Sequence, residues 1–514
     1  MNKARVILLN PPTAAESTEP LLGLGYLAAE LRKKGHEVKI VDATAPFKRL
    51  SQEDVEKIVV DYSPDFIGIT LTIDYIPYTY DYMRSLKNLK YPIIVGGPHV
   101  NPLPEEALEN GADIVVLGEG EITIGELADY FAGNGEKLEE IKGLCYRGQN
   151  GEVYHTGSRP LIKDLDSIPF PEFDDFPIKN YTGSDDPDSN PIFWSLFSSR
   201  GCPFNCIFCC GHNVFGRTYR MRSAENIFEE IRQLYRKYGA NKFAFQDDEV
   251  MIKRERIIKL CELIKSSGMK IKISVRSRID SLDTELLRIC KEAGFNRISF
   301  GIESWNDDSL IKMNKRYKVK DIEKGIEQLV EADYSNVNFN NIVGFPWETR
   351  EHYERNIKII SNIPDSIHYF TTVSTPIPYP NTELYNMYHK EYGFTNWWLK
   401  HEMHWQHWML FSKGNYQPAF YKIARKLLVF YSPDLYWHYS ERQLSDIEYF
   451  SWKLLWYFCR KHYGYLMSKI IILLCRVSIK LWKISPRTEK ILSGKILKHF
   501  INKIEQKLSF TNVE

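Results

Sequence analysis

Short apolar runs alternate with amphipathic stretches through the first 140 residues. Their spacing predicts strands at 5–9, 38–41, 66–70, 93–95 and 114–117, with helical segments between them. The first helix is predicted at 21–34, where Gly35 ends it. Strands that alternate with helices build a parallel sheet covered on both faces. Residues 1–140 are therefore predicted to form a Rossmann-like, doubly wound α/β domain with five strands.

Residues 141–190 predict a linker with one hairpin. Asn150-Gly151 separates two short apolar runs and is a typical hairpin turn. The rest of the segment is rich in proline, acidic and aromatic residues, and the prolines exclude regular helix.

A second alternation of strands and helices fills residues 191–390. Strands are predicted at 193–198, 243–245, 272–275, 297–300, 337–343 and 368–373, and helices at 224–238, 254–267, 284–293, 320–332 and 351–360. Ser223 and Gly239 supply the start and stop signals of the first helix. Six strands at this spacing predict a partial (β/α)6 barrel of the TIM type, with its site at the carboxyl ends of the strands.

Residues 391–514 predict a mainly helical region that is aromatic and basic. Eight of the eleven tryptophans lie there, together with 19 Lys+Arg against 9 Asp+Glu. We expect a helical cap whose aromatic side chains pack on the barrel. The alternative is a surface that contacts an anionic membrane or holds a large apolar substrate. His401, His404 and His407 would spread over too wide an arc of a helix for a metal triad.

The overall composition narrows the class of protein. A length of 514 residues predicts about two to four domains, and a hydrophobic share of 43% is typical of a soluble globular chain. Lys+Arg 67 and Asp+Glu 66 nearly cancel, so we expect no nucleic-acid partner. The first apolar run is too short for a signal peptide, and no run reaches the ~18 residues of a spanning helix. We expect a cytoplasmic protein, with membrane association through residues 391–514 as the alternative.

Four of the nine cysteines fall within residues 202–210. Cys202, Cys206 and Cys209 have the C-x3-C-x2-C spacing, and thiolates on a short loop are what an iron–sulfur cluster needs. Three thiolates would hold three irons of a four-iron cube and leave the fourth iron open. Zinc with His212 as fourth ligand is the alternative, and disulfides are disfavoured by the crowding. Cys210 is more simply explained as a packed or pocket-lining thiol.

The cysteine loop resembles the cluster loop of the radical S-adenosylmethionine (SAM) superfamily, in which an aromatic residue, here Phe208, precedes the third cysteine. The strand ends of the first domain are similar to the cobalamin-binding domain of a large class of that superfamily. The cobalamin contacts that this resemblance implies are Thr70, Leu71, Thr72, Gly96, Gly97, Pro98, His99, Glu119, Gly120 and Glu121. The Asp-x-His-x-x-Gly motif that supplies an axial imidazole elsewhere is missing from this sequence, so we expect no histidine axial ligand.

The resemblance also implies a SAM site at the barrel strand ends. The expected contacts are Phe208, Asp247, Ser274, Arg276, Glu303 and Gly344. Arg276 would clamp a carboxylate in bidentate fashion. For the acidic run at 247–249, an acidic helix N-terminus is an equal alternative, because Asp248 and Glu249 precede a predicted helix. Trp347 stands where glycine is usual in the family, which leaves the shape of the loop after Gly344 open.

The chemistry is likewise an implication of the resemblance. A reduced [4Fe-4S] cluster would cleave SAM to methionine and a 5′-deoxyadenosyl radical, which would activate a carbon for methylation by cobalamin. We expect a C-methyltransferase; the alternatives are a ring-forming or rearranging radical enzyme and a non-catalytic corrinoid or cluster sensor. A tRNA-methylthiolating enzyme is disfavoured because the first domain and its linker hold only Cys145. The expected partners are a small-molecule or lipid-like substrate and an electron donor such as flavodoxin or ferredoxin.

Overall fold

The computed structural model describes residues 2–12, 19–45, 49–178, 181, 194–364, 366–374, 376–391 and 394–399. They belong to two compact units. The first takes in residues up to 277, 285–298 and the described part of 378–404, and the second takes in 278–284 and the described part of 299–377. The helical region predicted at 391–514 lies outside the described residues beyond Leu399.

The N-terminal part of the first unit is a Rossmann-like α/β domain, as predicted. Its strands are β1 (Arg5–Asn10), β2 (Glu37–Asp42), β3 (Phe66–Thr70), β4 (Ile93–Gly96), β5 (Ile114–Val116), β6 (Leu144–Arg147) and β7 (Val153–His155). They form one sheet in the order β2-β1-β3-β4-β5-β6-β7. The pairs from β2 to β5 are all parallel. The winding direction changes between β1 and β3, which is where ligands bind in sheets of this type.

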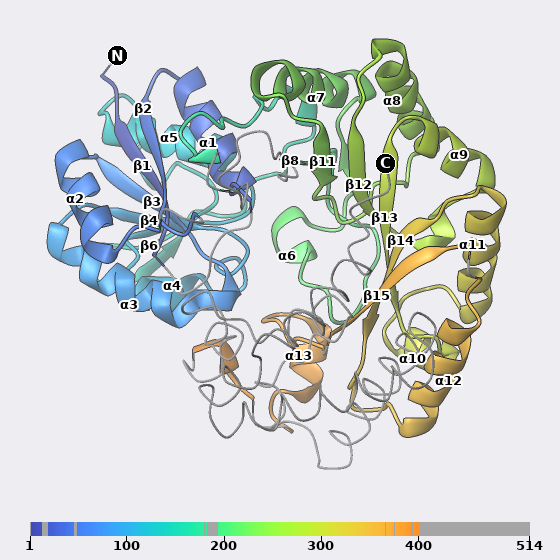
Figure 1. Ribbon diagram of the computed structural model, residues 1–514. Helices are drawn as coiled ribbons and strands as arrows, with labels where there is room; N and C mark the ends of the chain where they lie inside the picture. The colour runs from blue at the N-terminus through green and yellow to red at the C-terminus, as the bar shows by residue number, and fades with distance from the viewer. Residues whose placement is uncertain are drawn as a thin grey trace, which may run out of the picture. The chain divides into compact units, whose positions relative to one another are not determined.

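Helices cover both faces of this sheet. They are α1 (Leu22–Lys33), α2 (Gln52–Tyr62), α3 (Ile76–Leu86), α4 (Pro104–Glu109) and α5 (Gly120–Phe131), with 3₁₀ turns at η1 (Ile73–Tyr75) and η2 (Lys87–Leu89). Helices α1 and α5 pack together on one face, and α2, α3 and α4 lie on the other (Figure 1). The central strands are consequently apolar throughout, and all of Val6–Leu9 is buried.

The sheet has seven strands rather than the predicted five, because the hairpin expected in the linker joins it. β6 pairs antiparallel with β5, and β7 pairs with β6. Leu144 and Cys145 are fully buried, so the hairpin covers an edge of β5 that would otherwise expose its backbone. The turn follows the prediction, since Gly151 has φ +82°.

A six-stranded sheet confirms the predicted partial barrel. Its strands are β8 (Trp194–Leu196), β11 (Lys242–Phe245), β12 (Lys272–Ser277), β13 (Phe295–Glu303), β14 (Asn336–Ile342) and β15 (His368–Ser374). Their order in the sheet follows their order in the chain. The pairs β8–β11, β11–β12 and β14–β15 are parallel. This is the winding of a βα barrel.

The helices between these strands also follow the prediction closely. They are α6 (His212–Phe215), α7 (Ala224–Tyr238), α8 (Arg254–Ser267), α9 (Thr284–Glu292), α10 (Asp307–Lys312), α11 (Val319–Glu331), α12 (Arg350–Ser361) and α13 (Glu383–Tyr388), with 3₁₀ turns at η3 (Leu165–Ser167), η5 (Ile279–Ser281) and η6 (Trp397–Leu399). Ser223 caps α7 by accepting from the Asn226 amide, and Gly239 ends it in the left-handed region. α7 and α8 lie side by side (Figure 1).

The described part of the linker packs on the first domain. Tyr181 donates its hydroxyl to Asp42 at the end of β2, and Asp175 pairs with Arg32 at 2.5 Å. The boundaries at 140, 190 and 390 stay predictions.

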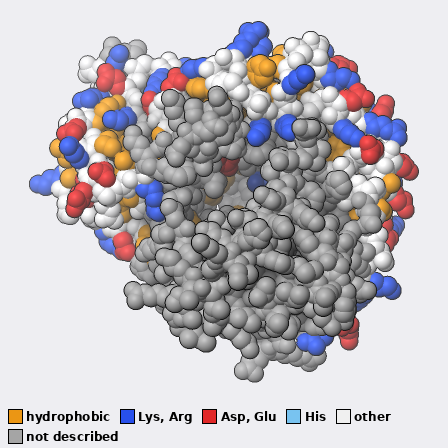
Figure 2. Space-filling view, in the orientation of Figure 1, with side chains coloured by type: hydrophobic (Ala, Val, Ile, Leu, Met, Phe, Trp, Pro, Cys, Tyr) orange, Lys and Arg blue, Asp and Glu red, His pale blue; other side chains and the backbone are white. Residues whose placement is uncertain are grey.

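The surface of one face mixes charges of both signs. Figure 2 shows Lys and Arg side chains interspersed with Asp and Glu over the described surface, without a broad field of one sign. Among the described residues, no helix combines the length and the apolar character needed to cross a membrane.

Candidate cofactor site

The cysteine loop is closed at its base by a two-stranded ribbon. β9 (Ser199–Arg200) pairs antiparallel with β10 (Arg220–Met221), so Arg200 lies opposite Arg220. Gly201 enters the loop at φ +82°, and a Cβ there would lie 2.4 Å from the Thr218 carbonyl oxygen. Only glycine fits this close approach of two backbones. The first predicted ligand, Cys202, follows immediately.

The three predicted cluster ligands lie on one tight turn. Cys202 and Cys206 are half-buried, Cys209 is exposed, and all three are thiols. The Cys209 amide donates to the Cys206 carbonyl at 3.1 Å, and the Gly211 amide donates to the Cys209 sulfur at 3.4 Å. Amide donors around sulfur suit a thiolate ligand of an iron–sulfur cluster. The donor set therefore fits the predicted cluster.

The protonation of the cysteine ligands in this turn depends on whether a metal cation is bound. Burial first, and then the nearby Asp248, Cys209 and Cys206, raise the pKa of the Cys202 thiol to about 11, although a backbone hydrogen bond from Phe204 acts against the shift. A bound cation reverses this balance, because a coordinating thiol is deprotonated outright. Within the described ranges, no three His, Cys, Asp or Glu side chains surround a point as ligands of a single metal ion.

Asp247 holds the strand that leads into the cysteine loop. Its carboxylate is buried and accepts from the Ser198 amide at 2.7 Å, the Ser198 hydroxyl at 2.6 Å and the Ser199 hydroxyl. Arg256 donates to the Ser198 carbonyl at 2.6 Å. Contact of Asp247 with SAM stays a prediction; what the structure shows is a carboxylate bonded to the cluster loop.

Glu119 and Glu121 also face the cysteine loop. Arg200 donates to Glu119 at 2.8 Å and to Glu121 at 2.5 Å, while Arg220 donates to both oxygens of Glu119 at 2.9 and 2.8 Å. All four side chains are buried. Contact of Glu119 or Glu121 with cobalamin stays a prediction. Such a contact would compete with the hydrogen bonds that Arg200 and Arg220 donate to these carboxylates. No local pattern in the sequence signals this pairing.

The predicted corrinoid site is a set of glycine-bearing loops at the ends of β3, β4 and β5. Gly97 has φ +108°, and a Cβ there would lie 2.8 Å from the Leu71 carbonyl oxygen. Gly118 has φ +76° with open space at its Cβ position, which leaves room for a ligand. Thr70 and Gly96 are half-buried at this edge. Thr72 and Pro98 are exposed. These features fit a flat ligand such as a corrinoid.

One residue that the sequence reasoning missed joins these loops. Asn101 donates its side-chain amide to the Gly97 carbonyl at 3.0 Å and accepts from the Gly118 amide at 2.6 Å. It therefore fixes the spacing between the two glycine turns. A lone asparagine in a loop carries no signal of this role in the sequence.

His99 is a packed side chain. Its ring is buried, and Nε2 lies 3.0 Å from Glu106, which also accepts from Tyr80 and from the Trp398 indole at 2.9 Å. The His99 ring meets the rings of Tyr80 and Trp398 edge-on. Contact of His99 with cobalamin stays a prediction.

The other predicted SAM contacts of the first unit lie in accessible positions. Ser274 is half-buried and Arg276 exposed, on one face of β12, whereas Ile273 and Val275 are buried on the other. Phe208 is half-buried in the cysteine loop. Their contact with SAM stays a prediction.

Glu303 and Gly344 belong to the second unit, and both have unusual backbone geometry. Glu303 has φ +63°, a strained conformation for a non-glycine residue, and its buried carboxylate pairs with Lys315 at 3.4 Å. Burial raises the pKa of Glu303, and Lys315 acts against this shift. Gly344 has φ +99°. Strain of this kind clusters at functional sites.

Trp347 does not disorganise the loop after Gly344. Its ring stacks on Phe345 with centroids 4.7 Å apart, and its indole donates to Ser309 at 3.1 Å. Glu348 accepts from the amides of Gly344 and Phe345 at 2.8 and 3.2 Å. A buried carboxyl therefore shapes this loop.

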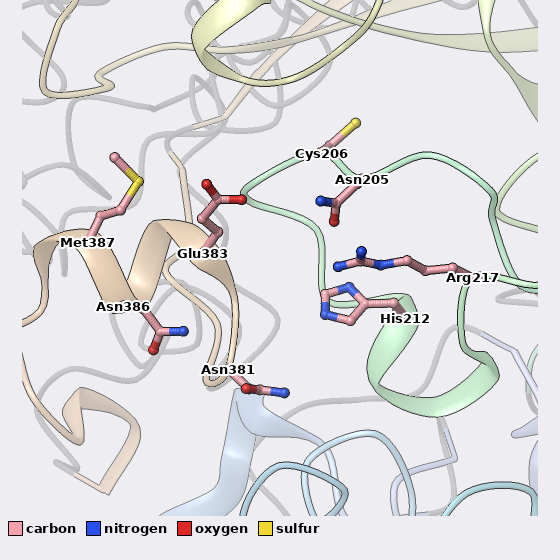
Figure 3. Close-up of a pocket in the computed structure, with 8 residues that line it drawn as sticks. All are labelled: Asn205, Cys206, His212, Arg217, Asn381, Glu383, Asn386 and Met387. Carbon is pink, nitrogen blue, oxygen red and sulfur yellow. The ribbon is translucent and has the colours of Figure 1, made fainter.

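A polar pocket of about 360 Å³ opens beside the cysteine loop. Its lining is Asn205, Cys206, His212, Arg217, Asn381, Glu383, Asn386 and Met387. Figure 3 shows Asn205, Arg217 and His212 on one side and Glu383, Asn386 and Met387 on the other. The Leu384 amide donates to the Ile207 carbonyl at 2.9 Å, which anchors α13 to the cysteine loop. A predicted cluster ligand thus lies in the wall of an accessible polar pocket.

Comparisons with known proteins agree with this geometry. Residues 196–360 match the family model described as the radical SAM superfamily, and residues 13–128 match the B12-binding domain. An uncharacterized methyltransferase of Pyrococcus horikoshii is 34% identical over 414 residues, which are 77% of this chain and 84% of that protein. The predicted cofactors, a [4Fe-4S] cluster, SAM and cobalamin, are those of these two families.

Two further similarities bear on function and fold. The anaerobic magnesium-protoporphyrin IX monomethyl ester cyclase of Cereibacter sphaeroides is 28% identical over 391 residues, 69% of this chain and 59% of that protein. The structure of the cobalamin-dependent SAM radical enzyme OxsB, with aqua-cobalamin and SAM bound, superposes with a TM-score of 0.65 at 17% identity, covering 91% of this chain and 74% of that one. The chain belongs to the radical SAM superfamily, in the class that carries an N-terminal B12-binding domain.

Proposed function

We propose that this enzyme methylates a carbon atom of a small-molecule substrate. The observation that carries the proposal is that the loop bearing Cys202, Cys206 and Cys209 is bonded directly to the turn between β5 and α5 of the B12-binding domain. The methyltransferase relative in Pyrococcus horikoshii supports the same reaction.

The cofactors supply the reactive groups, and the chain holds them in place. When bound, the cluster and SAM supply a 5′-deoxyadenosyl radical after one-electron reduction, and cobalamin supplies a methyl group. The three cysteines would ligate the cluster. The exposed Arg276 would pair with the SAM carboxylate, and the glycine turns at 97 and 118 would seat the corrinoid.

A ring-forming reaction is the second candidate, because the cyclase relative shares 28% identity over 69% of this chain. The two reactions differ in their SAM products. Methyl transfer leaves S-adenosylhomocysteine, whereas radical formation alone leaves 5′-deoxyadenosine and methionine.

The test is anaerobic reconstitution with iron, sulfide and cobalamin. The absorption spectrum reports the cluster and the corrinoid, and chromatography after addition of a reductant reports 5′-deoxyadenosine released from SAM. We expect both spectra and release of the nucleoside, and we expect Cys206→Ala to lose the cluster. A cluster-loaded protein that never cleaves SAM would be a sensor instead.

The electron donor would reach the cluster through the pocket beside Cys206. The exposed Arg217 on its lining would attract an acidic carrier such as flavodoxin or ferredoxin. Arg217→Glu should slow cluster reduction by flavodoxin about tenfold while leaving reduction by dithionite unchanged. Arg236→Glu, at an exposed position on α7, is the matched control. Equal flavodoxin rates in wild type and Arg217→Glu would contradict this docking site.

The remaining partners are part of the proposal. The substrate is a small molecule, either polar or lipid-like, and no nucleic acid is involved. Residues 391–514, with their aromatic and basic composition, would provide any peripheral contact of this cytoplasmic enzyme with a membrane.

A further inference from the structure

The base of the cluster loop and the B12-binding domain share one buried, charge-balanced network. It joins two carboxylates, Glu119 and Glu121, to two guanidiniums, Arg200 and Arg220. The side chains of Arg200 and Glu119 are only 5% and 2% exposed. Pairs this deeply buried are weakly screened by salt.

Arg200 is fixed on all sides. Its two terminal nitrogens bond separate carboxylates, and its guanidinium carbon lies 5.5 Å from the ring centroid of Tyr26 and 5.4 Å from that of Phe215. Burial alone would lower the pKa of Arg200, but Glu121 and Glu119 hold it above its ordinary value. The position of Arg200 therefore sets the position of Gly201 and Cys202, which follow it in the chain.

At the other end of this network, in the B12-binding domain, the carboxylates of Glu119 and Glu121 are also held in place. Glu119 immediately precedes α5, and it also accepts from the Ile162 amide at 2.8 Å. Gly118, next to it, holds the open turn that Asn101 ties to Gly97. The same few residues thus frame the predicted corrinoid site and clamp the cluster loop.

We propose that Arg200, acting through Glu119 and Glu121, is a positioning residue that couples cobalamin binding to cluster binding. A cluster on the three cysteines would further restrain the ribbon, and the two arginines would pass this restraint to the turn from Gly118 to Glu121. Cobalamin would then bind a turn that has less motion left to lose. Since coupling between two ligands is reciprocal, bound cobalamin strengthens retention of the cluster by the same factor. The inference rests on the cofactors of the proposed function but not on the reaction.

The test measures the dissociation constant of hydroxocobalamin by absorbance. It compares the cluster-loaded protein with the cluster-free protein in which Cys202, Cys206 and Cys209 are all replaced by alanine. Couplings of this kind are typically about 5- to 150-fold. We expect the loaded protein to bind at least about fivefold more tightly, with Arg200→Gln and Glu121→Gln reducing that ratio toward one and Arg200→Lys retaining part of it.

Glu230→Gln is the matched control. Glu230 and Arg222 form another buried pair, and Arg222 donates to the Phe197 carbonyl beside the same loop and to Asn226 in α7. If a substitution only destabilises the fold, it weakens cobalamin binding equally with and without the cluster. The ratio of the two dissociation constants then stays the same. A wild-type ratio of one, or an unchanged ratio in Arg200→Gln and Glu121→Gln, overturns the proposal. If Arg200→Gln does not fold, the ratio of dissociation constants in the wild type and in Glu121→Gln still tests the proposal. The measurement needs no turnover, so failure of the methylation assay would leave it intact.

Discussion

The carboxylate of Asp247 accepts two hydrogen bonds from Ser198, one from its amide at 2.7 Å and one from its hydroxyl at 2.6 Å. The bond to the Ser199 hydroxyl adds a third donor. A buried carboxylate with this many donors holds the backbone in one conformation. The cysteine loop begins at Gly201, two residues after Ser199. Asp247 therefore fixes the backbone position from which the cluster ligands follow.

Replacement of Asp247 should therefore affect the cluster. Asp247→Asn presents an N–H₂ group to donors that need an acceptor, and each unsatisfied buried donor costs about 1–3 kcal/mol. We expect a lower melting temperature and less than half of the wild-type iron content after reconstitution. Asp61→Asn, at an exposed position on α2, is the control. Full iron content in Asp247→Asn would show that the serine contacts are dispensable.

The glycine turn after β4 gives a prediction for cobalamin. Gly97→Ala would place a Cβ 2.8 Å from the Leu71 carbonyl oxygen at φ +108°. We expect destabilisation of about 1–3 kcal/mol and at least about tenfold weaker cobalamin binding. Gly133→Ala is the matched variant, because it has φ +74° with nothing within 4 Å of the added carbon. If both variants bind cobalamin equally well, the Gly97 turn is not part of the corrinoid site.

Glu348 predicts a pH dependence of stability. Burial raises the pKa of Glu348 from 4.5 to about 7, although donors from Gly344 and Phe345 act against the shift. As the pH rises, the unfolded state therefore loses the Glu348 proton before the folded state does. The resulting stability is present below pH 4.5 and is lost as the pH rises to about 7, by roughly 3 kcal/mol in total.

Unfolding measured by urea between pH 5 and 8 checks this prediction. Glu348→Gln mimics the protonated carboxyl and should lose less stability than the wild type across this range. Glu351→Gln, on the exposed side of α12, should retain the wild-type slope. Identical slopes in all three proteins would mean that Glu348 is ionised in the folded state throughout.

Local signals in the sequence predicted most of the fold. The cap at Ser223 and the stop at Gly239 act on their own helix, so α7 could be bounded from the sequence. The hairpin at 144–155 was recognised too, but its pairing with β5 depends on a contact distant in the sequence. The extra strands of the sheet therefore emerged only from the structure.

The sequence predicts which residue types form the candidate site, but it predicts few of the contacts between them. The spacing of Cys202, Cys206 and Cys209 is a local pattern, and it identified the cluster loop. Glu119 meets Arg200 across 81 residues, and no periodicity reports such a pair. Glu119 and Glu121 accept from the arginines of the cluster ribbon, which no local pattern signals, and the role of Asn101 between the two glycine turns carries no such signal either.

The central claim is methyl transfer that depends on both cofactors. The most direct measurement quantifies S-adenosylhomocysteine and 5′-deoxyadenosine from SAM in the reconstituted enzyme, with and without cobalamin, under a low-potential reductant. We expect both products with cobalamin, loss of S-adenosylhomocysteine without it, and neither product in the variant lacking Cys202, Cys206 and Cys209. Release of 5′-deoxyadenosine alone, with cobalamin bound, would contradict methylation and favour a ring-forming or rearranging enzyme.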